Sequence, residues 1–138
     1  MFTKILVPVD LAHAEKMDKA VRVASSLAQT YGAALCFVGV SSDAPTSVAH
    51  TPDEFAQKLS AFAADKGAAY GIAAVSEAVI VNDPAVELNH ALDKTIDGVG
   101  ADLVVMATHL PGVSDYIWAG HGAHVAAHSK ASVFLVRD

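Results

Sequence analysis

The sequence predicts an α/β protein built on a single open parallel sheet with helices on both faces. Five short apolar runs alternate with segments of helical periodicity, which is typical of β–α–β units joined by right-handed crossovers. The runs are rich in Val, Ile and Leu and alternate little between apolar and polar residues, as in strands covered on both faces. With 138 residues, 53% of them hydrophobic, the chain can bury a sizeable core, and we expect one domain over residues 1–138.

The elements follow from these patterns in order. The expected strands are Lys4–Val9, Ala34–Val40, Ser76–Val81, Asp102–Thr108 and Ser132–Arg137. Apolar residues at helical spacing predict a first helix from Met17 to Tyr31, stopped by Gly32.

Sequence signals for helix ends place the remaining helices. Thr51-Pro52-Asp53-Glu54 forms a capping box that starts a second helix, with Gly67 as its expected end. Asp83-Pro84 starts a third helix that runs to Val99, and a short fourth helix is expected from about Gly120 to His128. The stretch Ser41–His50 reads as a polar loop within the domain.

Composition excludes several classes of function. The formal charge of −6 is spread along the chain without a basic cluster, which argues against a nucleic-acid partner. The single cysteine, Cys36, lies in an apolar run and indicates a buried thiol in a reducing compartment. No run looks like a signal peptide or approaches the ~20 apolar residues of a membrane span, so we expect a soluble, cytoplasmic protein without membrane insertion.

The predicted fold also indicates where a ligand would bind. In open α/β sheets, ligands lie beyond the carboxyl ends of strands at a topological switch point. If the first and fourth strands flank that point, Pro8-Val9-Asp10 and Ala107-Thr108-His109 face one crevice. The loop Leu110–Ala119 would cover the crevice, and the fourth helix would direct its N-terminus, which favours phosphate, toward it.

Four motifs in this order carry a resemblance to a known family. They are KILVPVD at the start, NDPAVEL before the third helix, ADLVVMATH at the fourth strand and HSKASVFLVR at the end. Together they make the chain similar to universal stress proteins over nearly its whole length. The resemblance implies a five-stranded sheet of order 3-2-1-4-5, a homodimer joined through the last strand (Ser132–Arg137), and a crevice that in many members binds ATP or AMP.

The resemblance also implies a set of nucleotide-binding residues. Asp10 would lie near the adenine and ribose, the backbone around Val40 would contact the base, and the loop after the fourth strand would hold the phosphates. The full set is Pro8, Val9, Asp10, Val40, Met106, Ala107, Thr108, His109, Gly120, His121 and Gly122.

The phosphate loop departs from the family pattern. ATP-binding members resemble G-x-x-G-x9-G-[ST], whereas this chain has Ala107 and Leu110 at the first two glycines. Counting from the strand aligns Gly120 and His121 with the final glycine and hydroxyl residue of the pattern. Counting back from His128 aligns Ala119 and Gly120 with them instead. We prefer the second alignment because it preserves the spacing to the last strand. Either way the hydroxyl is missing. Its loss removes a hydrogen bond worth ~1.5–3 kcal/mol, roughly one to two decades of affinity, although His121 could supply a donor instead.

Each candidate also has a purely structural interpretation. His121, His124 and His128 share one helix face and could present imidazoles to a metal, but no nearby Cys, Asp or Glu completes a ligand set. We therefore expect packed or surface histidines and no metal. Asp10 could simply cap the turn after its strand. Trp118 and Tyr116 are expected to be packing residues.

Three functions remain, in order of preference. The first is a regulatory protein that binds an adenine nucleotide (ATP or AMP) without catalysis and presents a changed surface to a protein partner when the Leu110–Ala119 loop becomes ordered. The second is a dimeric interaction module that has lost nucleotide binding. The third is a nucleotide hydrolase, for which Asp115 is the only obvious carboxylate in the loop.

Overall fold

The structure is a computed structural model that describes residues 1–108, 118 and 120–137. Its strands are β1 (Lys4–Pro8), β2 (Ala34–Ser41), β3 (Ala74–Ile80), β4 (Leu103–Thr108) and β5 (Ser132–Arg137), and its helices are the 3₁₀ segment η1 (Leu11–Met17), α1 (Asp18–Tyr31), α2 (Pro52–Tyr70), α3 (Pro84–Val99) and α4 (Gly122–His128). The five predicted strands are confirmed to within two residues at each end.

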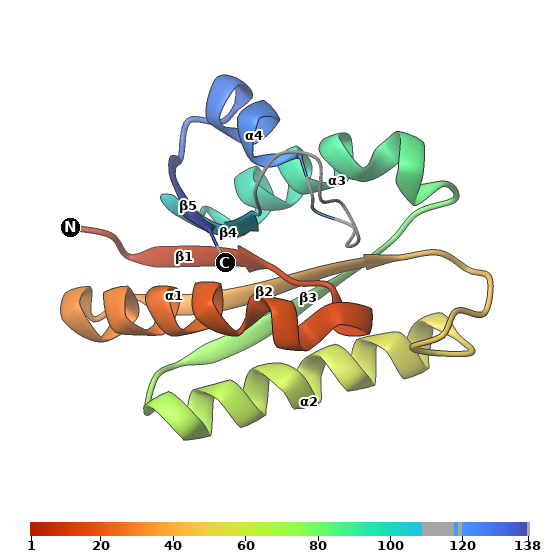
Figure 1. Ribbon diagram of the computed structural model, residues 1–138, viewed down its shortest axis with the longest axis horizontal. Helices are drawn as coiled ribbons and strands as arrows, with labels where there is room; N and C mark the ends of the chain where they lie inside the picture. The colour runs from red at the N-terminus through yellow and green to blue at the C-terminus, as the bar shows by residue number, and fades with distance from the viewer. Residues whose placement is uncertain (109–117, 119, 138) are drawn as a thin grey trace.

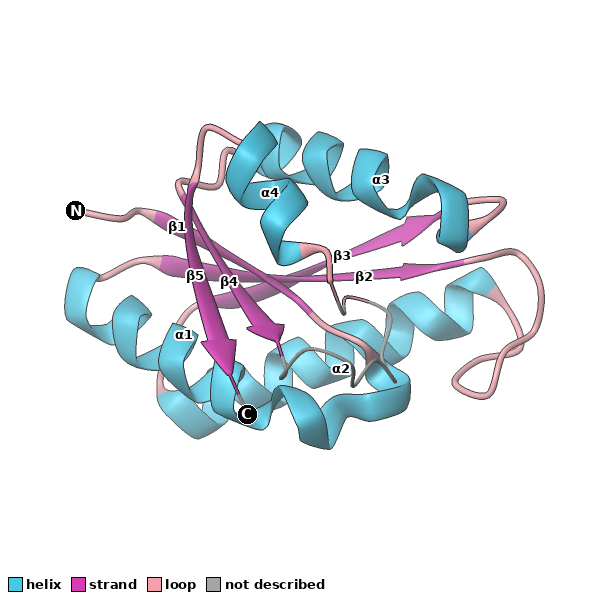
Figure 2. Ribbon diagram, turned by 45° about the horizontal axis from the view of Figure 1, so that its top comes forward, coloured by secondary structure: helices cyan, strands magenta, loops and turns pink. Residues whose placement is uncertain are grey.

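The strands form one parallel sheet in the order β3-β2-β1-β4-β5, as predicted. Helices α1 and α2 cover one face and α3 and α4 cover the other (Figure 1 and Figure 2). The core lies between these layers and is densest along β1 and β2, where Ile5, Leu6, Leu35 and Phe37 are fully buried. Because these strands are buried on both faces, their sequences are continuous apolar runs.

The two central strands β1 and β4 pair over a much shorter length than their neighbours. Their register consists of Ile5 with Leu103 and Leu6 with Val104, whereas β1 stays paired with β2 up to Pro8 and Val38. One residue further, the amide of Val9 still donates to the carbonyl of Val38. The sheet therefore divides at the carboxyl end of β1, where β1 is still paired with β2 but no longer with β4.

At the other end of the same pair, a carboxylate fastens β1 to β4. The side chain of Asp102 accepts hydrogen bonds from the amides of Thr3 (2.9 Å) and Lys4 (3.1 Å) and from the hydroxyl of Thr3 (3.1 Å). Burial alone would raise the pKa of Asp102, but these hydrogen bonds to its charged form outweigh burial and lower it.

One expectation about the helices is wrong, and one short helical segment was not expected. Helix α2 does not end at Gly67 but continues to Tyr70, and Gly71 ends it with a positive φ of 63°. Gly67 is instead needed for packing, because a Cβ there would lie 3.1 Å from the carbonyl oxygen of Ile72. The segment η1 was not predicted, since its seven residues are too few to show a helical period. Helix α4 is confirmed but starts at Gly122, two residues later than expected.

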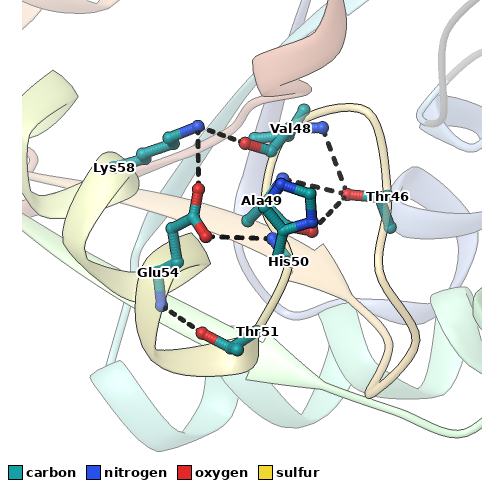
Figure 3. A network of polar contacts seen from close by, with 7 residues as sticks. All are labelled: Thr46, Val48, Ala49, His50, Thr51, Glu54 and Lys58. Atoms are coloured by element: carbon teal, nitrogen blue, oxygen red, sulfur yellow. Dashed lines mark hydrogen bonds and ion pairs between the residues drawn. The ribbon is translucent and has the colours of Figure 1, made fainter.

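The polar loop between β2 and α2 folds onto the start of α2 through a network of hydrogen bonds (Figure 3). The hydroxyl of Thr46 accepts from the amides of Val48 (3.2 Å) and Ala49 (3.3 Å), and the ammonium of Lys58 donates to the carbonyl of Val48. Thr51 caps α2 by accepting from the amide of Glu54, as the capping box predicts. The carboxylate of Glu54 accepts from the amide of His50, one residue before the expected partner.

We predict that the Asp102 contact stabilises the protein in a pH-dependent way. Because the folded pKa of Asp102 is lowered, its contribution is present above the pKa of the unfolded carboxyl, about 3.9, and is lost as the pH falls through the folded value. Asp102→Ala should reduce the free energy of unfolding at pH 7 by about 1–3 kcal/mol, since two amides lose their acceptor.

Urea unfolding of both proteins between pH 7 and pH 3 measures this difference. The difference between the two free energies of unfolding should decrease below about pH 4. A difference that stays constant down to pH 3 would contradict the lowered pKa of Asp102. Asp43→Ala, in the exposed part of the β2–α2 loop, is the matched control and should change stability little.

Candidate functional site

A small cavity lies at the carboxyl ends of β1 and β2, on one side of the division between β1 and β4. Its volume is about 170 Å³. Three of the residues predicted to bind nucleotide, Val9, Asp10 and Val40, line it. The remaining lining comes from the turn after β1, the β2–α2 loop and the helices that follow: Leu11, Ala12, Ser41, Ser42, Thr46, Ser47, Val48, Phe55 and Pro84.

Asp10 combines both interpretations offered by the sequence. Its Oδ1 accepts from the amide of Ala12 (3.1 Å), so Asp10 caps η1. Its Oδ2 lies 3.0 Å from Nδ1 of His13, and its side chain is 13% exposed in the wall of the cavity. The cap therefore holds the carboxylate in a defined position at the cavity.

A wider surface groove between η1 and α2 lies next to the cavity. This groove has a volume of about 770 Å³ and shares Leu11, Ala12, Ser47 and Val48 with the cavity. Drug-sized ligands occupy sites of about 300–1,000 Å³. The cavity alone therefore accommodates part of a nucleotide, and a whole one would extend into the groove or displace a wall.

The other predicted site residues lie apart from the cavity among the residues that the structure describes. Pro8, Met106 and Ala107 are buried at the ends of β1 and β4, and Thr108 is half-buried. Gly120 is exposed with a φ of 79°, and Gly122 lies against Leu135, whose Cδ2 a Cβ at this position would meet. The predictions for His109, Leu110, Asp115, Tyr116 and Ala119 fall outside the described residues, so neither alignment of the phosphate loop is tested.

His121 does not point freely into solvent but is held at the start of α4 by two neighbours. Its Nδ1 lies 2.6 Å from Oδ1 of Asn89 on α3, so Nδ1 carries the proton and Nε2 keeps its lone pair while the ring is neutral. Its ring packs edge-to-face against the indole of Trp118, with centroids 6.3 Å apart. Burial first, and then the charge of His124, lower the pKa of His121.

Trp118 is a packing residue, as predicted, and it also reaches the site. It is 2% exposed, and its indole Nε1 donates to the carbonyl of Val9 at 3.0 Å. Val9 lines the cavity, so the indole contacts the strand end that forms the cavity wall. No local pattern in the chain signals this contact, because it joins residues 109 positions apart.

Helix α3 holds His124 of α4, and His128 stacks on His124; sequence spacing could not reveal the contact with α3. Nε2 of His124 lies 2.9 Å from Oδ2 of Asp93, and the His124 and His128 rings stack with centroids 4.3 Å apart. Although Asp93 adds a carboxylate, the described part of the chain contains no group of three or more His, Cys, Asp or Glu side chains that could hold a metal ion. Cys36 is buried, and burial raises its thiol pKa to about 11, as expected of an inert thiol.

Comparison with known proteins identifies the family. The model of the universal stress protein family matches residues 1–137. The chain belongs to this family. No helix in the described ranges is long and apolar enough to cross a membrane. A search among curated proteins found no match to the sequence.

Solved structures of universal stress proteins share the fold at low sequence identity. One in complex with cAMP is 22% identical, with 98% of this chain and 97% of that chain covered and a TM-score of 0.68. One from Archaeoglobus fulgidus in complex with dAMP is 15% identical (96% and 96% covered, TM-score 0.67). One from Arabidopsis thaliana with AMP bound is 16% identical (98% and 91% covered, TM-score 0.61). Relatives with this fold thus carry adenine nucleotides.

We predict that the indole hydrogen bond stabilises this universal stress protein. Trp118→Phe keeps an aromatic ring but removes the donor, which leaves the carbonyl of Val9 without its partner. The free energy of unfolding should fall by about 1–3 kcal/mol, measured by urea denaturation. Tyr31→Phe, which changes a 38% exposed ring, is the control and should be nearly neutral. A Trp118→Phe protein as stable as the wild type would show that the contact contributes nothing.

Proposed function

We propose that this protein is a regulatory universal stress protein that binds an adenine nucleotide, with AMP or ATP as the ligand and without a catalytic step. The observation that carries the proposal is the cavity at the carboxyl ends of β1 and β2, beside the point where β1 and β4 separate, with Asp10 in its wall. Open α/β sheets bind ligands at this position. Relatives of the same fold have been crystallised with cAMP, dAMP and AMP.

In this proposal the base enters the cavity beside Val9 and Val40, and Asp10 accepts a hydrogen bond from the ribose or the base. Apolar walls suit a flat heteroaromatic ring, and a carboxylate held by a cap is a strong acceptor. The cavity also offers hydroxyl groups for polar contacts, from Ser41, Ser42, Thr46 and Ser47.

The phosphates would lie toward Gly120, His121 and Gly122, with a weaker grip than in members that keep the loop glycines and hydroxyl. Nδ1 of His121 is engaged by Asn89, so Nε2 is the atom that remains for a phosphate oxygen. Nε2 donates a hydrogen bond only when the ring is protonated. Binding would shift the protein toward a conformation that a protein partner in the cytoplasm recognises.

A second candidate is a dimeric interaction module that has lost nucleotide binding. The small cavity of about 170 Å³ favours it, because a complete nucleotide needs more room than the described walls leave. The two candidates differ in one measurable property, namely whether adenine nucleotides bind at all.

We predict that Asp10→Asn weakens nucleotide binding about ten- to a hundredfold. Asparagine can still cap η1, but the hydrogen bond to the ligand loses its charge, which is worth ~1.5–3 kcal/mol. Isothermal titration calorimetry with AMP, ADP and ATP measures the affinities. Asp18→Asn, on the exposed surface of α1, is the matched control and should bind like the wild type. No heat and no thermal shift at millimolar nucleotide in the wild type would favour the interaction module.

We further propose that the protein forms a homodimer through β5. In the described structure β5 pairs on one side only, with β4, and it leaves Phe134 and Leu135 44% and 45% exposed. An edge strand with exposed apolar side chains can pair with a second copy of itself.

Phe134→Asp should therefore shift the protein from dimer to monomer by at least tenfold in the dissociation constant, because a charge would be buried at the interface. Size-exclusion chromatography with light scattering over a range of concentrations measures this shift. Val75→Asp changes an equally apolar residue, 60% exposed on the opposite edge strand β3, and should leave the dimer intact. Equal effects of the two variants, or a monomeric wild type, would contradict the proposed interface.

A further inference from the structure

The β2–α2 loop forms a wall that the cavity and the neighbouring groove share. Ser47 and Val48 of this loop line both spaces, together with Leu11 and Ala12 of η1. The cavity has a volume of about 170 Å³ and the groove of about 770 Å³. Sites for drug-sized ligands have volumes of about 300–1,000 Å³, so the cavity by itself is too small for a nucleotide. Displacement of the loop would join the two spaces into one that is large enough.

The loop also contains the longest exposed segment next to the cavity. Residues 43–47 are exposed without interruption, whereas Val9, Val40 and Phe55, which form other parts of the cavity wall, are buried. Segments with few buried contacts and with hydrogen bonds near solvent open at the lowest free energy. The loop is therefore the part of the wall that a ligand can displace without disturbing the core.

The end of the loop is a compact turn that is tied to α2 by side chains of the helix. Within the turn, Thr46 donates its amide to the carbonyl of Ala49 (2.8 Å) and accepts from the amides of Val48 and Ala49. These bonds hold the shape of the turn but do not attach it to the helix. Figure 3 shows the attachments: the ammonium of Lys58 donates to the carbonyl of Val48, and the carboxylate of Glu54 accepts from the amide of His50 at 3.1 Å.

Lys58 holds the residue of the loop that forms the shared wall. Val48 lines both the cavity and the groove, and Lys58 itself lines the groove. The ammonium also lies 3.3 Å from Oε1 of Glu54, one turn earlier on α2, so it is positioned between the helix and the loop. The side chain of Lys58 is 51% exposed, and water competes for contacts of this kind. The attachment is therefore strong enough to favour the closed loop and weak enough to open.

We propose that the β2–α2 loop is a gate between the cavity and the groove, and that Lys58 is the positioning residue that keeps this gate closed. The consequence for ligands rests on the proposed nucleotide binding. The closed cavity has room for part of a nucleotide, and the whole molecule fits when the gate is open. The apparent affinity for a nucleotide is then the affinity of the open form reduced by the fraction of the protein that is open.

Hydrogen exchange of the free protein tests the gate without any ligand. The amide of His50 donates to Glu54 across the junction between the loop and α2, and NMR follows its exchange. Lys58→Met keeps a long side chain but removes the ammonium. The amide of His50 should then exchange about tenfold faster, as expected when a hydrogen bond from a charged group is lost. Amides in the middle of α2 should exchange as in the wild type.

Two further variants separate the role of Lys58 from a general effect of charge. Lys58→Arg keeps a charged donor and should restore the exchange rate of the wild type. Lys94→Met removes an exposed lysine of α3 and is the matched control, which should also exchange like the wild type. Unchanged exchange of His50 in Lys58→Met would overturn the proposal. Equal acceleration in the middle of α2 would assign the effect to global stability and would overturn it as well.

Calorimetry with AMP tests the consequence for binding. Lys58→Met should bind AMP about three- to tenfold more tightly than the wild type, because a larger fraction of the protein is open. Loss of a positive charge alone would weaken the binding of an anion, so the sign of the change distinguishes the gate from the charge.

The outcomes separate the gate from the nucleotide function. If the wild type binds AMP and Lys58→Met binds it equally or more weakly, the gate is refuted and the nucleotide function stands. Absence of AMP binding in both proteins, together with faster exchange of His50 in Lys58→Met, would refute the nucleotide function and leave the gate standing.

Discussion

The separation of β1 from β4 is the constraint on which the rest of the structure depends. These strands share only two paired positions, fastened at one end by Asp102, and then diverge. Parallel strands that part in this way leave unpaired carbonyls and space at their carboxyl ends, and buried carbonyls need partners. Here the indole of Trp118 donates to the carbonyl of Val9, and the cavity with Asp10 in its wall lies beside this contact. The candidate site is therefore a consequence of sheet topology.

Near this division, single residues make contacts with more than one part of the structure. Asp10 caps η1 and lines the cavity, while His121 anchors α4 to α3 and packs on the indole. Groups held by such contacts are fixed before a ligand arrives, which reduces the entropy lost on binding.

The sequence predicted features whose signal lies within a few neighbouring residues, and it did not predict contacts between distant segments. The caps Thr51 and Asp83 were predicted because a cap is read within four residues, and both are confirmed by hydrogen bonds. The prediction that α2 ends at Gly67 was wrong. The carbonyl of Ile72 lies close to Gly67, and this contact cannot be seen from the sequence of the helix alone. Of the predicted nucleotide-binding residues, three line the cavity, and each of them lies within two residues of the end of a strand.

Periodicity and short motifs in the sequence were enough to predict the fold class, the strands and the family, and the structure has a cavity at the carboxyl ends of two strands, where the sequence predicts a site. Only the tertiary structure decided which side chains meet there. Asn89 with His121, Asp93 with His124 and Trp118 with Val9 join residues between 31 and 109 positions apart. Such pairs depend on how α3, α4 and β1 pack against each other, and no local pattern in the chain encodes that packing.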